Sequence, residues 1–351
     1  MSETPRILVI RLGAMGDVLL TTPALRALRA RFPSARIDVL VKSAFAPLVA
    51  GHPAVDGVIV FDRAQGFRQA VQTVRVGRYT HVADLQSNPR SRWAAWRSGA
   101  PHRVRFHHDR FKRWLLLRFH WDLYREERPV PQRYLEALSA WGVTDDGRGL
   151  ELAVDTESRS TAQKWLGERG IPPGSPIVAL APGAAWPTKR WPEERYQVLA
   201  RHFAEAGNHV LVLGGPEETE RCRRVALAAG ARGHVAAGGF TRMETGALLA
   251  SARLLVTNDT GLMHMACALD RPVVAVFGPT ARQLGFFPFR ARSRVVETDL
   301  PCRPCAKHGS KACPKGHFRC MLDIDPETVM KACAALLEAL PQKPLPGRDR
   351  L

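Results

Sequence analysis

Short apolar runs alternate with amphipathic segments along most of the chain. In the first half, apolar residues recur at helical spacing from Val18 to Phe32, where Pro33 ends the pattern, and again at 134–141. Strands that alternate with helices predict a parallel sheet with helices on both faces. The runs that we expect to form its strands are 6–11, 37–41, 58–61, 82–85 and 104–106.

The second half repeats this alternation after a polar, Gly- and Pro-rich stretch near 145–175. The expected strands are 177–180, 209–213, 234–236, 254–257 and 273–277, and the expected helices are 192–206, 217–229 and 243–250. We therefore predict two Rossmann-like domains, 1–155 and 156–351, that face each other across a cleft. The second domain includes a Cys-rich segment at 302–320 and a C-terminal helix, and we expect the Pro-rich tail after Pro341 to fray.

Size and composition agree with a globular protein of two domains. The chain has 351 residues, of which 45% are hydrophobic. It contains no apolar run of 18 residues, which predicts that it has no transmembrane helix. Its N-terminus shows no signal-peptide pattern, so we expect the protein in the cytoplasm.

The charge of the chain is strongly positive, at +18. Arg spread over solvated faces would explain it, as would a nucleic acid, an acidic membrane surface or a phosphorylated substrate as partner. The segment from Arg90 to Arg128 favours a local basic and aromatic surface. Its basic and aromatic residues include Arg92, Trp93, Trp96, Arg97, Arg103, Arg105, Arg110, Lys112, Arg113, Trp114, Arg118, Phe119, Trp121 and Arg125.

The first turn from strand to helix carries Gly13, Gly16 and Asp17. It lacks the G-x-G-x-x-G pattern of dinucleotide sites and the Lys of a Walker A loop. The glycines allow a ligand to approach the backbone closely, and we expect Gly16 to contact the substrate. Asp17 follows the carboxyl end of the first strand, where ligands bind in open α/β sheets. It is either the cap of the next helix or a general base.

Two turns of the second half carry residues suited to a phosphate. In the first, Thr188 and Lys189 lie in a Gly- and Pro-rich loop, where the Lys fits a phosphate clamp and the Thr a substrate contact. In the second, Glu217 follows two glycines and is either a ribose ligand or a favourable charge at a helix start.

The turn Asn258-Asp259-Thr260-Gly261 is the richest in polar groups. The backbone N–H groups of Thr260 and Gly261 open a helix, which is a favourable place for a diphosphate. Asp259 could bind a sugar hydroxyl or orient the Lys of the preceding loop. His264 follows one helical turn later and is either a ligand contact or a semi-buried imidazole.

Four cysteines fall within one segment, which is rich in turn residues. They could hold structural zinc or another metal, or remain free or redox-labile thiols. Disulfides are disfavoured in the cytoplasm. No motif indicates a catalytic metal, and we expect no cofactor for catalysis. The four are Cys302, Cys305, Cys313 and Cys320.

Three stretches in this order resemble the ADP-heptose:lipopolysaccharide heptosyltransferases. They read GAMGDVLLTTPALRALRARFP, PGAAWPTKRWPEERY and VTNDTGLMHMACALDRPVVAVFGPT, and the KRWP and TNDTGLMH forms are most similar to heptosyltransferase II. The resemblance covers about 6–338. It implies a GT-B architecture and a metal-independent, inverting transfer of L-glycero-D-manno-heptose from ADP-heptose to the inner core of lipopolysaccharide, with a heptosyl-Kdo2-lipid A type of acceptor.

The resemblance also implies roles for the residues above. Asp17 would be the general base on the acceptor hydroxyl, and Lys189 would stabilise the diphosphate leaving group. The donor would contact the turn at 259–261 with His264 near it, and Glu217 would lie near the ribose. The segment 90–128 would serve an anionic, lipid-linked acceptor at the cytoplasmic face of the inner membrane. The alternatives are a GT-B enzyme with another nucleotide sugar and a basic nucleic-acid-binding protein, although no nucleic-acid motif supports the latter.

Overall fold

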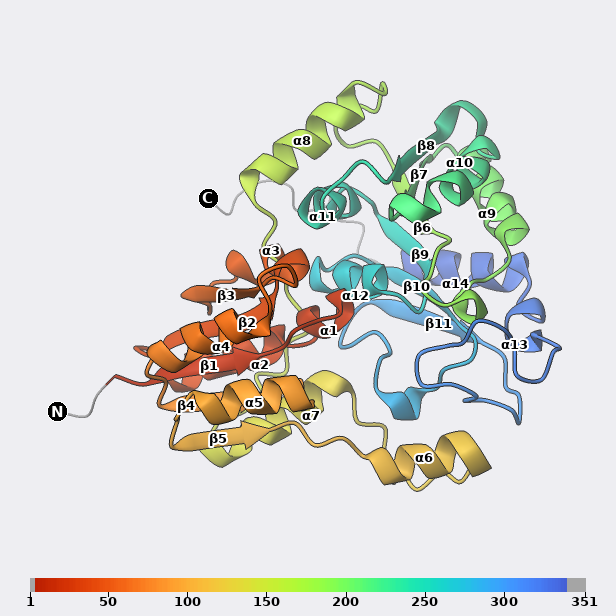
Figure 1. Cartoon of the computed structure of the whole chain (residues 1–351). Helices are drawn as coiled ribbons and strands as arrows, with labels where there is room; N and C mark the ends of the chain where they lie inside the picture. Colours follow the sequence, from red (N-terminus) through yellow and green to blue (C-terminus); the bar gives the residue numbers. More distant parts are fainter. Residues whose placement is uncertain (1–3, 340–351) are drawn as a thin grey trace.

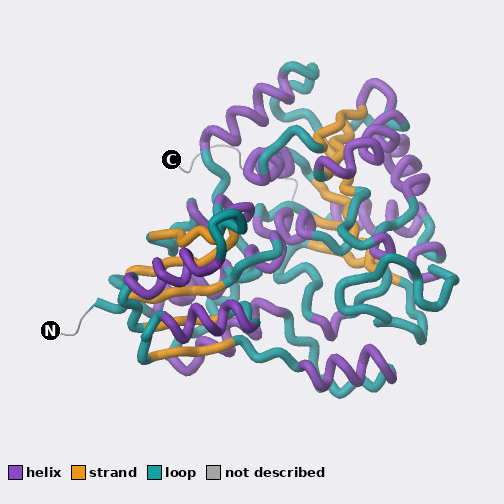
Figure 2. The backbone as a smooth tube through the Cα atoms, viewed as in Figure 1, coloured by secondary structure: helices purple, strands orange, loops and turns teal. Residues whose placement is uncertain are grey.

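Two separate parallel sheets form the centres of two α/β lobes (Figure 1). The computed structural model describes residues 4–339. The strand order is β3-β2-β1-β4-β5 in the first sheet and β11-β10-β9-β6-β7-β8 in the second. Figure 2 shows the strands of each lobe with helices beside them. The predicted α/β class with two parallel sheets is confirmed.

The first lobe follows the predicted alternation, with additional short helices. Its central strand β1 is fully buried from Ile7 to Ile10, because helices cover both faces of the sheet. Its elements are β1 Arg6–Ile10, α1 Met15–Leu19, α2 Thr22–Arg31, β2 Arg36–Lys42, α3 Pro47–Ala50, β3 Gly57–Phe61, α4 Phe67–Val76, β4 His81–Asp84, α5 Pro89–Arg97, β5 His102–Arg105, α6 Arg110–Phe119 and α7 Val130–Leu138.

The second lobe contains all five predicted strands and one more, β11, at the edge of its sheet. Its apolar strands β9 and β10 are fully buried. Its elements are α8 Thr156–Gly167, β6 Ile177–Ala181, α9 Glu193–Glu205, β7 His209–Gly214, α10 Thr219–Leu227, β8 Gly233–Ala237, α11 Arg242–Ala250, β9 Leu254–Asn258, α12 Gly261–Ala268, β10 Val273–Phe277, β11 Ser293–Glu297, α13 Arg319–Leu322 and α14 Pro326–Glu338. The tail after Pro341 lies outside the described residues.

The prediction of one helix over 18–32 is wrong, because the segment folds as α1 and α2. Thr21 and Thr22 donate their hydroxyls to carbonyl oxygens three residues earlier, at 2.6 and 2.8 Å. Pro23 has no N–H group and lies in the first turn of α2. The hydroxyls thus satisfy carbonyls at the end of α1, and the proline favours a new start over a continuous helix.

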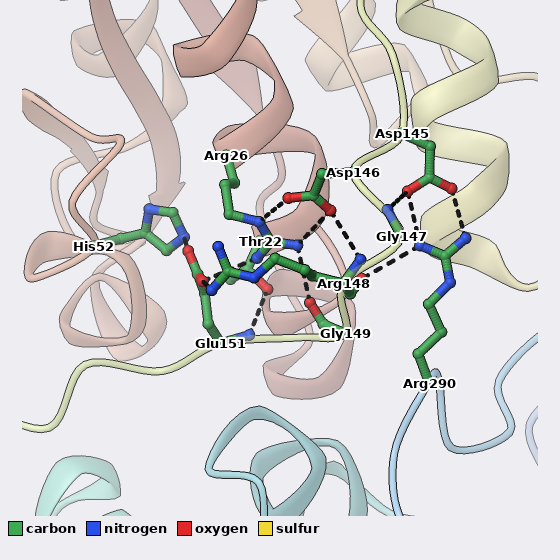
Figure 3. A network of polar contacts seen from close by, with 10 residues as sticks. All are labelled: Thr22, Arg26, His52, Asp145, Asp146, Gly147, Arg148, Gly149, Glu151 and Arg290. Carbon is green, nitrogen blue, oxygen red and sulfur yellow. Dashed lines mark hydrogen bonds and ion pairs between the residues drawn. The ribbon is translucent and has the colours of Figure 1, made fainter.

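The segment that joins the lobes is bound to both of them (Figure 3). Arg26 of α2 pairs with Asp146 and, at 2.9 Å, with Glu151. On the side of the second lobe, Arg290 pairs with Asp145 at 2.5 Å. These ion pairs hold the linker at a defined place beside the first sheet. Within residues 4–339, no helix has the length and apolar character needed to cross a bilayer.

Candidate active site

The starts of α1 and α12 bring the two lobes into contact (Figure 1). A Cβ atom at Gly16 would lie 2.6 Å from Cδ2 of His264, and one at Gly261 would lie 2.4 Å from Cε of Met15. Glycine at both positions therefore lets the two helix N-termini approach closely. This contact joins the first predicted turn with the turn at 258–261.

Asp17 is held at this contact as an ionised carboxylate. Its Oδ1 lies 2.7 Å from a guanidinium nitrogen of Arg11, and its Oδ2 accepts the backbone N–H of Ala14 at 3.1 Å. Burial works to raise the pKa of Asp17, but the charge and hydrogen bond of Arg11 outweigh it and the pKa lies below its ordinary value. The Asp17 side chain is 22% exposed, so one edge of the carboxylate remains accessible. Both hypotheses from the sequence, cap and base, fit this geometry.

A cavity of about 260 Å³ opens beside Asp17, and we call it the cationic cavity. Residues of both lobes line it, because Lys307 and His308 reach it from the Cys-rich segment of the second lobe. One carboxylate faces five cationic groups, so the cavity favours an anionic ligand. Its charged residues are Arg11, Asp17, Arg110, Arg113, Arg133 and Lys307.

Three of these cations are not neutralised by the protein. Arg110, Arg113 and Lys307 have no carboxylate within 4.0 Å in the described part of the chain. By contrast, Arg133 pairs with Asp109 at 3.2 Å. Burial lowers the pKa of Lys307 to about 8, and burial with the nearby cations also lowers the pKa of Arg113. Burial is the main cause of both pKa shifts and the neighbouring cations add to it, while neither group forms an ion pair in the described part of the chain.

A different cavity, of about 400 Å³, is lined mainly by the second lobe and also by Met15 of α1, and we call it the glycine-rich cavity. The start of α12 opens on it, and the Thr260 side chain makes no capping hydrogen bond. Helix N–H groups and the dipole at such a start favour a phosphate. The wall combines glycines with an apolar part and one carboxylate, which suits a nucleoside diphosphate. It includes Gly183, Gly214, Phe240, Thr260, Gly261 and Glu218.

Asn258 explains how the loop that carries Lys189 is positioned. This fully buried side chain donates to the carbonyl oxygens of Pro182 and Gly183, at 3.1 and 3.0 Å. Its own Oδ1 accepts the N–H of Trp191 at 3.1 Å. One amide thus fixes both ends of the loop to the end of β9.

Lys189 and Asp259 form an ion pair. The Lys189 Nζ lies 2.6 Å from Oδ2 of Asp259, and both side chains are largely buried, at 13% and 6% exposed. The same oxygen accepts the Thr280 hydroxyl at 2.8 Å. The predicted orientation of Lys189 by Asp259 is therefore present. Neither residue lines the two cavities, so their contact with a ligand stays a prediction.

Thr188 and Glu217, which were also predicted to contact the ligand, do not line either cavity. The Thr188 hydroxyl donates to the carbonyl oxygen of Ser310 at 3.0 Å and accepts the backbone N–H of Ser310 at 2.8 Å. It therefore anchors the Cys-rich segment. Glu217 is exposed, whereas Glu218 lines the glycine-rich cavity and accepts the N–H of Gly215 at 2.9 Å. The carboxylate that lines the glycine-rich cavity is therefore that of Glu218, and the contact of Glu217 with a ribose stays a prediction.

The Cys-rich segment forms a wall of the site. All four of its cysteines are free, and burial raises the pKa of Cys320 to about 11. In residues 4–339, no three His, Cys, Asp or Glu side chains are grouped so that they could hold a metal ion. Whether these thiols hold a structural metal or stay free, as considered from the sequence, stays a prediction. A Cβ at Gly309 would lie 3.2 Å from Cγ of Lys189, which shows how closely the segment packs on the site.

The family called Glycosyltransferase family 9 (heptosyltransferase) matches residues 67–315, which is more than half of the chain. This chain belongs to glycosyltransferase family 9. It is therefore a glycosyltransferase with the heptosyltransferase architecture, and the predicted family and enzyme class are confirmed.

Individual relatives cover almost the whole chain. Lipopolysaccharide heptosyltransferase 1 of Pseudomonas aeruginosa is 31% identical over 92% of this chain and 92% of its own. Lipopolysaccharide heptosyltransferase 2 of Escherichia coli is 27% identical over 95% of this chain and 98% of its own. The solved structure of the E. coli ADP-heptose heptosyltransferase II gives a TM-score of 0.73 at 26% identity, over 95% of this chain and 98% of that one. A family 9 structure from Veillonella parvula gives 0.81 at 27% identity, over 96% and 98%. The relatives include heptosyltransferases of type 1 and of type 2, so the assignment of this chain to type II stays a prediction.

The sequence interpretation missed several residues that line the two cavities of this heptosyltransferase. Arg11 directly follows β1, so its place at the carboxyl end of a strand was a usable signal. Lys307 carried no such signal, because it reaches the cavity from the Cys-rich segment. Glu218 carried none either, because its neighbour Glu217 is also an acidic residue after the same two glycines. Only the fold shows which of them faces a cavity.

We expect His264 to make the stability of this heptosyltransferase sensitive to acid. It is 4% exposed, its Nδ1 has no hydrogen-bond partner among the described residues, and burial lowers its pKa to about 4. Between pH 6.5 and 4 the unfolded chain binds a proton here and the folded chain does not, so the free energy of unfolding falls as the pH falls. Relative to His264→Gln, the wild type should lose about 2 kcal/mol between pH 7 and pH 5. Urea unfolding at both pH values measures this, and an equal loss in both proteins would contradict it. The predicted contact of His264 with a ligand stays a prediction.

Proposed function

We propose that this heptosyltransferase transfers L-glycero-D-manno-heptose from ADP-heptose to an anionic, lipid-linked inner-core acceptor of lipopolysaccharide, with inversion at the anomeric carbon. The observation that carries the proposal is the place of Asp17. An ionised carboxylate from the first lobe stands in a cationic cavity, beside the helix start that opens on the glycine-rich cavity. One cavity suits an anionic acceptor and the other a nucleoside diphosphate donor.

The reaction would use the two lobes for different steps. Asp17 accepts the proton of the acceptor hydroxyl, whose oxygen attacks the anomeric carbon of the heptose. The bond from that carbon to the β-phosphate oxygen breaks, and ADP leaves with its electron pair. Lys189 and the N–H groups at Thr260 and Gly261 stabilise the charge that develops on the diphosphate. Attack opposite to the leaving group inverts the anomeric centre.

The names of the relatives support the choice of donor and acceptor. One solved relative is named as an ADP-heptose heptosyltransferase II, and the matching curated proteins are named as lipopolysaccharide heptosyltransferases. A Glu218 carboxylate and an apolar wall at Phe240 and Leu262 fit a ribose and an adenine in the glycine-rich cavity. Because the acceptor is lipid-linked, we place the enzyme in peripheral contact with the cytoplasmic face of the inner membrane.

A transfer assay tests the proposal. The purified enzyme is given ADP-heptose, UDP-sugars or GDP-sugars, with Kdo2-lipid A that carries or lacks the first heptose. We expect product only with ADP-heptose and, for a type II enzyme, only with the acceptor that carries a heptose. Transfer from UDP- or GDP-sugars alone would identify another GT-B activity, and product on Kdo2-lipid A itself would identify a type I enzyme.

The cationic cavity should serve the acceptor and not the donor. Charge reversal in the double variant Arg110→Glu, Arg113→Glu should raise KM for the acceptor about tenfold or more at low salt, because both cations face the cavity without a counterion. KM for ADP-heptose should change little. Steady-state kinetics with each substrate varied in turn measure both constants.

Arg68→Glu, Arg75→Glu is the matched control for this prediction. Both residues are exposed on α4, away from the cavity, and the double variant changes the net charge by the same amount. If the control raises acceptor KM equally, the effect is one of total charge and the cavity has no special part in it.

A further inference from the structure

Helix α6 and the residues after it expose a continuous row of aromatic rings. The rings are 68%, 53%, 44% and 62% exposed, in chain order. Successive ring centroids lie 6.2, 5.3 and 5.4 Å apart, so the rings form one surface rather than isolated side chains. We call this surface the aromatic ridge, and it consists of Phe111, Trp114, Phe119 and Trp121.

The ridge is not part of the core of the first lobe. On the same helix, Leu115 and Leu116 are buried and provide the packing that holds α6 in place. Figure 1 shows α6 at the lower edge of the molecule, with its outer side away from both sheets. Exposing such rings to water is unfavourable, and a contiguous apolar surface of this kind marks an interaction site.

The charges around the ridge restrict the kind of partner. Helix α6 carries Arg110, Lys112, Arg113 and Arg118 and contains no acidic residue. Trp and Phe on one side of a helix with Arg and Lys beside them are typical of helices that lie in the interface of an anionic membrane. A partner protein would need a matching acidic apolar groove, whereas an anionic bilayer offers both properties over any area.

Helix α6 also contributes side chains to the cationic cavity that contains Asp17. Arg113, next to Trp114 in sequence, lines the cationic cavity together with Asp17. The same short helix therefore presents rings outward and cations toward the site. This arrangement would keep the mouth of the cavity close to the headgroup level of a bilayer.

We propose that the aromatic ridge is a membrane-docking surface, which inserts into the interface of a bilayer that contains anionic lipids and holds the cationic cavity over it. The part of this inference that concerns a lipid-linked acceptor rests on the proposed function. The binding of lipid itself does not, so the two can fail separately.

Vesicle binding tests the docking surface directly. The full chain is sedimented with vesicles of phosphatidylethanolamine and phosphatidylglycerol, and with vesicles of phosphatidylcholine alone. We expect binding to the anionic vesicles that weakens with salt, and a loss of at least about tenfold in the partition coefficient for the triple variant Phe111→Ser, Trp114→Ser, Trp121→Ser. Thermal unfolding checks that this variant is folded, which its exposed positions favour.

The control variant removes three exposed apolar side chains elsewhere on the surface. Val76→Ser, Leu227→Ser, Leu322→Ser changes residues that are 73%, 71% and 46% exposed on α4, α10 and α13. It should bind vesicles like the wild type. Equal losses in both triple variants, or unchanged binding after removal of the ridge, would overturn the proposal. So would a wild type that forms a dimer through the ridge and binds no vesicles.

Kinetics separate docking from catalysis. With acceptor embedded in anionic vesicles, the ridge variant should show a raised KM for the acceptor. With a deacylated, water-soluble acceptor, its KM and kcat should equal those of the wild type, because no ridge residue lines either cavity. A defect with the soluble acceptor would assign the ridge to the site itself and contradict the docking role. Absence of transfer by the wild type would refute the proposed function and leave the vesicle result standing.

Discussion

Asp17→Asn is expected to lower kcat by about a hundred- to ten-thousandfold, the range for loss of a general base. Asparagine cannot accept the proton of the acceptor hydroxyl at neutral pH. Its side-chain oxygen can still accept the N–H of Ala14, so the start of α1 keeps its hydrogen bond. Donor affinity should stay close to that of the wild type, because Asp17 does not line the glycine-rich cavity. Single-turnover transfer and calorimetric titration with ADP measure the two quantities.

The same substitution distinguishes a role of Asp17 as general base from a role as helix cap. If Asp17 were only a cap, Asn would preserve the role and turnover would stay near the wild-type value, which would refute the assignment as base. The variant also leaves the buried Arg11 without its carboxylate, so thermal unfolding must accompany the kinetics. Asp146→Asn is the matched control, since it breaks an Arg–Asp pair in the linker (Figure 3) and should leave kcat unchanged.

The sequence was sufficient to predict most of the fold. Buried parallel strands such as β1, β9 and β10 are short apolar runs flanked by turn residues, and this pattern depends only on local composition. The break between α1 and α2 was missed because the apolar spacing continues across it. What ends α1 is the hydrogen bonding of Thr21 and Thr22 to the backbone, which the periodicity of apolar residues does not report.

The site was predictable where it depends on one turn and not where it depends on contacts between distant segments. Asp17 and Asp259 follow strand ends, and the sheet places both at the facing edges of the lobes. Lys307 approaches Asp17 only because the Cys-rich segment folds back over the turn that carries Thr188. No spacing in the sequence encodes a contact over that separation. The same is true of α6, whose outward rings become a continuous surface only in the folded helix.

Lys189→Ala is expected to weaken ADP-heptose binding by about ten- to hundredfold, since a charge-assisted hydrogen bond to a phosphate contributes about 1.5–3 kcal/mol. Turnover should fall as well, because the same ammonium would stabilise the leaving diphosphate. Calorimetry with ADP and initial rates at saturating donor measure the two effects. Lys331→Ala, which removes an exposed lysine paired with Glu327 on α14, is the control and should change neither.

A complication of Lys189→Ala is that it leaves Asp259 buried without its cation, and breaking such a pair costs about 3–5 kcal/mol of stability. The double variant Lys189→Met, Asp259→Asn removes both charges and keeps an acceptor for the Thr280 hydroxyl. Its stability should recover toward that of the wild type, while its ADP affinity should remain low. If affinity recovers together with stability, Lys189 acts on the fold alone and the phosphate assignment is wrong. If affinity stays low in a stable double variant, the loss comes from missing contacts of these two side chains with the ligand and not from the fold, and Asp259→Asn alone gives the share of Asp259.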